Sequence, residues 1–392
     1  MVKTLLQEAT EFAEELTKWR RYLHRHPELD MTLPETVAFV KEQLKEMGIA
    51  CTVSEKAGYV TALIGEGKHC FLLRSDMDAL PVREESGVEF ASENGCMHAC
   101  GHDLHATILL GAAKLLKAHE NELKGCVKLL FQPGEETFHG GKAAVEDGIL
   151  ENPHVDAAFA MHVSSTVPVG LIGYGPEPMS SVYGFKITLT GKGGHGSTPE
   201  ICVDPINAGV QIYLAMQALI ARECPSAEEA VLTIGQFDAG NAANIIPERA
   251  VLQGTLRTFK KEIAEKMIHR IEEVINTVAE TYRTKAELEV LYNVPAVNCT
   301  EDVIKECVDS IQELNPDFQI LPLYHVMGSE DFAFISDCVP NAYFAIGAGV
   351  DDQSKWVGQH NPKVQFHEAS LPIGAAAYAK VAMDWLEKHG DE

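Results

Sequence analysis

Short apolar runs separated by helical segments occupy the first part of the chain, and this alternation limits the folds open to it. Residues 60–64, 70–74, 127–131 and 157–161 are short runs rich in β-branched, aromatic or aliphatic residues, as strands are. Residues 108–116, after the second run, carry apolar side chains at helical spacing. The pattern predicts an α/β unit in which helices cover a mainly parallel or mixed sheet.

The pattern changes between residues 179 and 295. Alternating apolar and polar residues and helical spacing succeed each other there in the order strand, helix, strand, strand, helix, strand. This order predicts a ferredoxin-like α+β unit whose sheet is solvated on one side. At 392 residues the chain is long enough for two domains. We therefore predict a domain made of residues 1–178 and 296–392, interrupted by an inserted domain of residues 179–295.

Two details concern the N-terminal helices. Apolar residues from Leu5 onward recur at helical spacing and predict one amphipathic helix that ends near Pro27. Thr32 and Glu35 have the spacing of a capping box for a second helix, and Gly48 has the position of its terminating glycine.

Composition excludes several classes of function. A net charge of -25 and a pI near 5.0 argue against nucleic-acid binding, because phosphates would be repelled. No run approaches the ~18 apolar residues of a membrane helix, and acidic residues interrupt the apolar N-terminus where a signal peptide would be uniform. The ten cysteines are scattered without a C-x-x-C pair, which is typical of reduced thiols. We expect a soluble, cytoplasmic protein.

The run from residue 97 to residue 105 is the first candidate for chemistry. Its Cys100-Gly101-His102 segment puts a thiol and an imidazole two positions apart, so that in extended backbone both would point to one face. Gly101 would let the backbone pass close to an ion. The segment is compatible with a metal site and also with a buried free cysteine beside surface histidines.

Three further donors follow segments that are predicted as strands or loops. Glu136, which is adjacent to Glu135, follows a buried strand and a Pro-Gly turn, and His162 and His360 lie at a predicted strand end and in a loop. The glutamate pair is also typical of a helix N-terminus, and a lone histidine is more often a satisfied polar group. With Cys100 and His102, however, five N, O and S donors are available, which suggests two ions bridged by the thiolate or by a water.

The predicted inserted domain holds three further candidates. His195 follows a glycine-rich run that lacks phosphate-loop spacing, so it is either an exposed turn residue or a side chain that a mobile loop delivers to a substrate oxygen. Asn244 and Arg257 are lone polar residues in apolar surroundings. Arg257 could form a surface ion pair, or its guanidinium could bind a substrate carboxylate with two hydrogen bonds.

Seven short runs stand in order along nearly the whole chain. They are RRYLH at 20–24, RSDMDALP at 74–81, HACGHD at 98–103, QPGEE at 132–136, GKGGH at 191–195, GSEDF at 328–332 and HNP at 360–362. Taken together, these runs resemble the amidohydrolase branch of peptidase family M20, which includes hippurate hydrolases, N-acyl-amino-acid deacetylases and auxin-conjugate hydrolases.

The resemblance implies a hydrolase with two divalent metal ions (zinc, manganese or similar), whose catalytic domain is interrupted by a domain that acts as lid and dimer interface. It also implies residue roles. Glu135 is the general base and His195 stabilises the oxyanion, while Asn244 and Arg257 line the substrate pocket. Asp76 and Asp103 orient ligands. The implied metal ligands are Cys100, His102, Glu136, His162 and His360.

The predicted reaction is hydrolysis of the amide bond of an N-acyl amino acid by metal-activated water, giving a carboxylate and a free amino acid. The alternatives are a dipeptidase or carboxypeptidase on the same scaffold, and a catalytically silent binding relative. Residues 137–139 and the run 196–206 depart from the common family pattern, which leaves the acyl group and the amino acid open. The expected partners are this small-molecule substrate and further copies of the chain, bound through the lid domain as a homodimer or higher oligomer.

Overall fold

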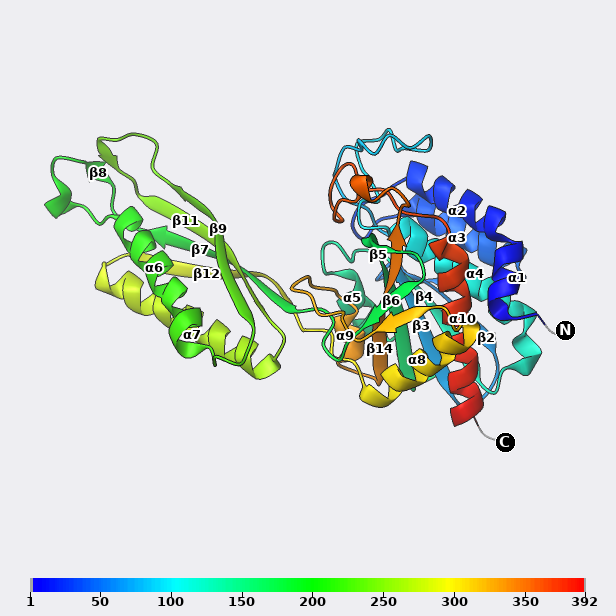
Figure 1. Ribbon diagram of the computed structural model, residues 1–392. Helices are drawn as coiled ribbons and strands as arrows, with labels where there is room; N and C mark the ends of the chain where they lie inside the picture. Colours follow the sequence, from blue (N-terminus) through cyan, green and yellow to red (C-terminus); the bar gives the residue numbers. More distant parts are fainter. Residues whose placement is uncertain (1–2, 391–392) are drawn as a thin grey trace. The chain divides into compact units, whose positions relative to one another are not determined.

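The computed structural model describes residues 3–390, which form two compact units (Figure 1). Unit 1 contains the chain up to Pro178, Asn298–His325, and the chain from Asp331 onward. Unit 2 contains Met179–Val297 and Val326–Glu330. Each unit has its own hydrophobic core.

Unit 1 is built on an eight-stranded mixed sheet in the order β1-β2-β4-β3-β5-β14-β6-β13. The central pairs β4–β3, β3–β5 and β5–β14 are parallel, whereas β1–β2, β2–β4 and β14–β6 are antiparallel. The predicted α/β class with a mixed sheet is therefore confirmed. In sheet order the strands are Cys51–Val53, Val60–Gly65, Cys126–Gln132, Cys70–Asp76, Ala157–Pro168, Asn341–Gly349, Leu171–Tyr174 and Gln319–Leu321.

Helices cover this sheet. All residues of β3 and β4 are buried, as expected for central strands with both faces covered. Helices α4 and α10 pack against each other and against β3, with α1, α2 and α8 packed on them. The helices of unit 1 are α1 Leu5–Glu11, α2 Ala13–Arg25, α3 Pro34–Glu46, α4 His102–Ala118, α5 Gly140–Glu146, α8 Glu301–Leu314, α9 Ala333–Ser336 and α10 Ser370–His389, with 3-10 turns η1 Glu120–Glu122 and η3 Gln353–Lys355.

Two predictions for the N-terminal helices are wrong. The predicted single helix is interrupted at Phe12, which separates α1 from α2. The capping box of Thr32 is absent from α3, because the Glu28 carboxylate accepts the backbone N–H groups of Glu35 and Thr36 at 3.1 and 2.8 Å. A side chain from outside the helix therefore caps it. Gly48 does follow the helix with a positive φ, as predicted.

Unit 2 is an antiparallel four-stranded sheet in the order β12-β7-β11-β9, with α6 and α7 packed on it. Numbered along the chain, this is the strand order four, one, three, two of a ferredoxin-like fold, as predicted. Its elements are β7 Ser181–Thr190, α6 Pro205–Glu223, β9 Ala230–Ala239, β11 Arg249–Thr258, α7 Lys261–Thr281 and β12 Lys285–Val294, together with β8 Gly194–His195, η2 Pro199–Ile201 and β10 Ile245–Ile246.

The strand that carries His162 differs from its prediction. His162 was expected at the end of a strand, but β5 continues for six more residues to Pro168. Its pairing with β3 nevertheless ends at Arg74↔Ala160. His162 therefore lies two residues past the part of β5 that pairs with β3, at the level of Asp76, the last residue of β3. None of the helices within residues 3–390 is both long and apolar enough to cross a membrane.

Candidate metal centre

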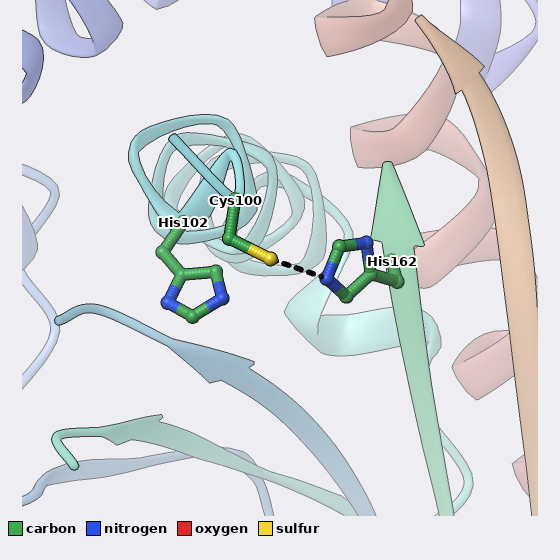
Figure 2. Close-up of side chains that lie close together, drawn as sticks. All are labelled: Cys100, His102 and His162. Carbon is green, nitrogen blue, oxygen red and sulfur yellow. Dashed lines mark hydrogen bonds between the residues drawn. The ribbon is translucent and has the colours of Figure 1, made fainter. Parts of the chain in front are cut away.

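The Cys100 thiol and the His162 ring lie in contact. The two side chains point toward each other, with Cys100 Sγ 3.3 Å from His162 Nε2 (Figure 2). His162 Nδ1 lies 2.7 Å from the carbonyl oxygen of Val163, which can only accept a hydrogen bond. Nδ1 therefore carries the proton, and the lone pair of Nε2 faces the sulfur. Both facing atoms have the chemistry of metal ligands.

Gly101 fixes the turn between Cys100 and His102. It has φ +94 and precedes the first residue of α4, so the segment is not the extended one that was expected. A Cβ here would lie 2.4 Å from Val163 Cγ2 and 3.1 Å from the Phe366 ring. The need for glycine therefore comes from the positive φ and from packing against these two side chains.

His102 leaves one ring nitrogen unsatisfied. Its Nδ1 donates to the carbonyl oxygen of Asp78 at 2.9 Å. Its Nε2 is buried and has no hydrogen-bond partner among residues 3–390. This atom lies 3.8 Å from Glu135 Oε2 and 3.9 Å from Glu136 Oε1, and Glu136 Oε1 is unsatisfied as well. Buried polar atoms normally have partners, so these two atoms fit a cation placed between them.

The Asp78 carboxylate holds the glutamate pair in place. Its Oδ1 and Oδ2 accept the backbone N–H groups of Glu135 and Glu136 at 3.1 and 3.0 Å. The alternative that this pair begins a helix is wrong, because the next helix, α5, starts at Gly140. The two glutamates instead lie in a turn that a buried carboxylate holds against the end of β3.

His360 approaches the same place from a distant loop. It has φ +65, and its backbone N–H donates to the carbonyl oxygen of Ala99 at 2.9 Å, beside Cys100. Its Nε2 lies 3.4 Å from Glu136 Oε2. The structure thus brings a residue of the C-terminal part of the chain next to the Cys100 segment.

Two sets of donor atoms share the Cys100 sulfur. One set joins Cys100 to His102 and His162, and the other joins it to Glu136 and His360. Within each set the donor atoms lie within 4.8 Å of one another. The structure therefore collects all five predicted ligands, in an arrangement suited to two ions with a common sulfur.

The charges of the site also fit cations. Burial raises the pKa of Glu136 to about 7, against the opposing effect of His102. Burial, together with Glu136, raises the pKa of the Cys100 thiol. Burial alone would favour a neutral His102, yet the Asp76 carboxylate raises the pKa of that ring. Donors that retain protons in this way release them when a divalent cation binds, because the cation then supplies the positive charge.

Asp76 and His105 resemble a further metal set with His102, but their bonds argue otherwise. His105 Nδ1 lies 2.6 Å from Asp76 Oδ1, and His105 Nε2 accepts the backbone N–H of Val163 at 2.9 Å. Both nitrogens of this ring are thus occupied. Its role is to connect Asp76 to the backbone beside His162, and Asp76 itself lies 3.8 Å from His102 Nε2.

A buried arginine anchors Asp76. Arg74 donates from Nη1 to Asp76, from Nη2 to Asp331 and from Nε to Gln132, at 2.8, 2.8 and 3.0 Å. Asp331 also accepts from the Gln132 amide and from the backbone N–H of Gly141. The GSEDF run of the sequence thereby acquires a structural role, which is to supply a counter-charge to Arg74.

Asp103 was expected to orient a metal ligand, but its carboxylate bonds to side chains of α2. Its Oδ2 accepts from Arg20 Nε and His24 Nδ1, both at 2.8 Å. Burial favours protonation, yet Arg20 and His24 hold the pKa of Asp103 well below its usual range. His24 also contacts Glu84 at 3.0 Å. These bonds tie α2 to the first turn of α4, so any orienting effect on His102 passes through the helix backbone.

The three candidates of unit 2 are divided between two places in that unit. His195 lies in β8, paired with Ile245 of β10, and the backbone N–H of Gly196 donates to the Asn244 carbonyl at 2.8 Å. His195 Nδ1 accepts the backbone N–H of Ser197 at 3.1 Å, so the ring proton lies on Nε2. Arg257 instead donates from Nη1 to the Met327 carbonyl and to Ser329 Oγ, at 2.8 and 2.9 Å.

Asp78, Arg74 and His105 are the contributors that the sequence analysis did not assign to the site. Asp78 could have been found, because Asp76 and Asp78 stand two apart directly after a buried strand. The parts played by Arg74 and His105 depend on partners far away in the sequence, and no local pattern indicates them.

Comparison with known proteins places the chain among related sequences. The model of peptidase family M20/M25/M40 matches residues 72–384. The chain is 35% identical over 383 residues to the IAA-amino acid hydrolase ILR1-like 2 of Arabidopsis thaliana, covering 95% of this chain and 85% of that one. It is 34% identical over 381 residues to the N-acetylcysteine deacetylase of Bacillus subtilis, covering 96% and 98%.

A solved structure from the same family also has a similar fold. The Bacillus subtilis YXEP protein, described as a dinuclear metal binding peptidase from the M20 family, matches with a TM-score of 0.82 and 32% identity. The match covers 96% of this chain and 99% of that one.

Removal of the Asp78 carboxylate tests the geometry of this site. Asp78→Ala should weaken divalent-metal binding by about 10–100-fold, because two backbone N–H groups beside the glutamates lose their acceptor. Isothermal titration of the metal-stripped chain measures this. Asp156→Ala is the matched control. Like Asp78, Asp156 accepts a backbone N–H with its side chain, but that N–H belongs to Cys70 at the start of β3. Equal weakening in both variants would show that Asp78 acts only through general stability.

Proposed function

The chain belongs to peptidase family M20/M25/M40, a family of metal-dependent hydrolases of amide bonds, and within that family we propose that it deacylates N-acyl amino acids. The observation that carries the proposal is the pair of donor sets around Cys100 with two buried unsatisfied atoms, His102 Nε2 and Glu136 Oε1. The named activities of an IAA-amino acid hydrolase and an N-acetylcysteine deacetylase support the substrate class.

We assign the five donors as ligands of two divalent ions, with Cys100 in both sets. A thiolate favours zinc, while carboxylate and imidazole also suit manganese, so the donor set accepts either metal. Two divalent cations bound there would polarise the scissile carbonyl and lower the pKa of an attacking water. The residues of the chain then supply proton transfer and substrate orientation.

Glu135 is the general base in this proposal. Its carboxylate is buried and lies near His102, yet it is in neither donor set that contains Cys100. Glu136 is the member of the pair that belongs to such a set. Glu135 therefore remains to accept the proton of the attacking water and to pass it to the leaving nitrogen, which completes the hydrolysis.

His195, Asn244 and Arg257 complete the proposal as substrate-binding residues of unit 2, which would serve as the lid. The Nε2–H of His195 is the ring's donor and suits a developing oxyanion, an interaction of about 3–4 kcal/mol for a good donor. Within residues 3–390 the bonds of Arg257 are made from Nη1, and we assign its Nη2 and Nε to a substrate carboxylate. The ten free cysteines support the proposed cytoplasmic location.

Isosteric substitution of the two adjacent glutamates separates their roles. Glu135→Gln should retain both metal ions and lose turnover by roughly 10²–10⁴-fold, because the proton acceptor is lost. Glu136→Gln and Cys100→Ser should instead lower the metal content. Elemental analysis and initial rates on acetyl-amino acids measure both effects. A fully active Glu135→Gln enzyme would show that another residue is the base.

A substrate panel tests the proposed reaction against the peptidase alternative. N-acetyl, N-benzoyl and indole-acyl amino acids should be hydrolysed in preference to dipeptides of the same C-terminal residues. Chelation should abolish the activity, and Mn²⁺ or Zn²⁺ should restore it. Preference for dipeptides with a free amino group would favour the dipeptidase, and inactivity on every substrate with metal bound would favour a silent binding relative.

We also propose that copies of the chain associate through unit 2. Exposed apolar residues lie on α6 and on the neighbouring β9, where the Phe237 ring reaches Gly209 of α6; they are Val210, Tyr213, Leu214 and Phe237. Leu214→Glu should shift sedimentation velocity from dimer or higher oligomer to monomer, since a charge would be buried in the interface. Leu63→Glu, at an exposed leucine of unit 1, is the matched control. A parent chain that sediments as a monomer would contradict the proposal.

A further inference from the structure

Two buried cysteines lie opposite each other at the start of the central strands. Cys70 begins β3 and Cys126 begins β4, and they are direct partners in the parallel register. Neighbouring strands lie about 4.8 Å apart, which is within the Cα separation of roughly 4.4–6.8 Å that disulfides require. The side chains of register partners share a face of the sheet, which brings the two thiols side by side.

The backbone around the pair keeps this register. The Cys70 N–H donates to Asp156 Oδ2 at 2.8 Å, and the Cys70 carbonyl accepts the Asp156 N–H at 2.9 Å. The Cys126 N–H donates to the carbonyl oxygen of His69 at 2.9 Å. A Cβ at Gly125 would lie 2.6 Å from that same oxygen, so the approach of the strands is close. These bonds hold the first residues of β3 and β4 in the register that makes Cys70 and Cys126 partners.

The surroundings make the two sulfurs unequal. The Cys70 thiol, aided by the nearby Lys128 ammonium, lowers the pKa of Cys126 despite its burial. The Cys126 sulfur and burial raise the pKa of Cys70, which favours its protonated form. Lys128 is held in place by the carbonyl oxygens of Ile149, Glu151 and Pro153 at 2.8–2.9 Å. The Cys126 sulfur is thus suited to attack an oxidant first, and the Cys70 sulfur to attack the oxidised Cys126 afterwards.

We propose that Cys70 and Cys126 form an oxidisable dithiol, which a small hydroperoxide converts into a disulfide between β3 and β4. The Cys126 thiolate attacks the peroxide O–O bond, giving a sulfenic acid and one molecule of water or alcohol. The Cys70 sulfur then attacks the sulfenic sulfur and displaces its oxygen as water, with the Cys70 proton. The dithiol loses two electrons and two protons, and the hydroperoxide is reduced. A small-molecule thiol reverses the bond by exchange.

The oxidant must be small and must enter at the end of the sheet. Cys126 is 4% exposed and Cys70 is fully buried, so access is through Cys126. The pair lies at the start of β3 and β4, whereas Asp76 and Gln132 end the same strands near the candidate metal centre. The disulfide would close the loop of residues 70–126, which contains Cys100. It should therefore stabilise unit 1 against unfolding without contacting the metal ligands.

The test is a disulfide map of the metal-loaded chain. After treatment with a few equivalents of hydrogen peroxide, denaturation and alkylation, peptide mass analysis should find Cys70 joined to Cys126 with the loss of two hydrogens. Dithiothreitol should reverse the link. The oxidised chain should also unfold at a Tm higher by roughly 5 °C. Recovery of both cysteines as alkylated thiols, under conditions that oxidise other cysteines, would overturn the proposal.

Serine variants identify the attacking sulfur. Cys70→Ser should accumulate a sulfenic acid at Cys126 that dimedone traps, whereas Cys126→Ser should leave Cys70 unmodified. Cys307→Ser is the matched control, because Cys307 is equally buried but lies on α8, outside this register, and this variant should keep the link. Dimedone labelling of Cys70 in the Cys126→Ser variant would overturn the assigned order. The map of the parent chain does not depend on how well these variants fold.

Discussion

The Arg74 guanidinium is the charge on which the functional end of unit 1 depends. It is fully buried, and a buried cation is tolerated only with complete hydrogen bonding and counter-charge. Asp76 and Asp331 supply the charge, and Gln132 accepts a third bond, from Nε. These partners come from β3, from β4 and from the segment where the chain re-enters unit 1, so one side chain joins three parts of the sequence. Its loss would leave two buried carboxylates without their cation.

The candidate ligands share a common arrangement beyond this anchor. His102, His162 and Glu136 are each held at one polar group and leave another for a metal. His162 and His102 donate from Nδ1 to backbone carbonyls, which directs Nε2 of each ring inward. Glu136 is held at its backbone N–H by Asp78, and its Oε1 is left unsatisfied. The protein therefore fixes the orientation of these groups before any ion arrives, which lowers the cost of ordering them on binding.

The sequence predicts the fold and several candidate site residues, but not the hydrogen bonds that position them. Strand and helix periodicity is a local property, so the mixed sheet and the inserted ferredoxin-like unit follow from it. Cys100, Glu136 and His360 were recognisable because rare donor types stand beside glycine or proline turns. Asp78 could be recognised as a candidate from its position after a buried strand, but the backbone N–H groups that it accepts are determined by the folded turn at Glu135 and Glu136. The length of β5 beyond His162 and the cap that Glu28 places on α3 likewise depend on tertiary neighbours.

The cysteines show how far environment, rather than residue type, decides chemistry. Cys100 and Cys126 both lie in unit 1, yet their pKa values move in opposite directions. Around Cys100 burial and the Glu136 carboxylate disfavour a thiolate, so a thiolate there requires a cation, and the neighbouring imidazoles are arranged to share one. Around Cys126 the Cys70 thiol and the Lys128 ammonium already favour the thiolate. An oxidisable thiol at the start of β4 and a metal ligand beside the last residue of β3 can thus occur in one unit, because the length of the strands keeps their charged neighbours apart.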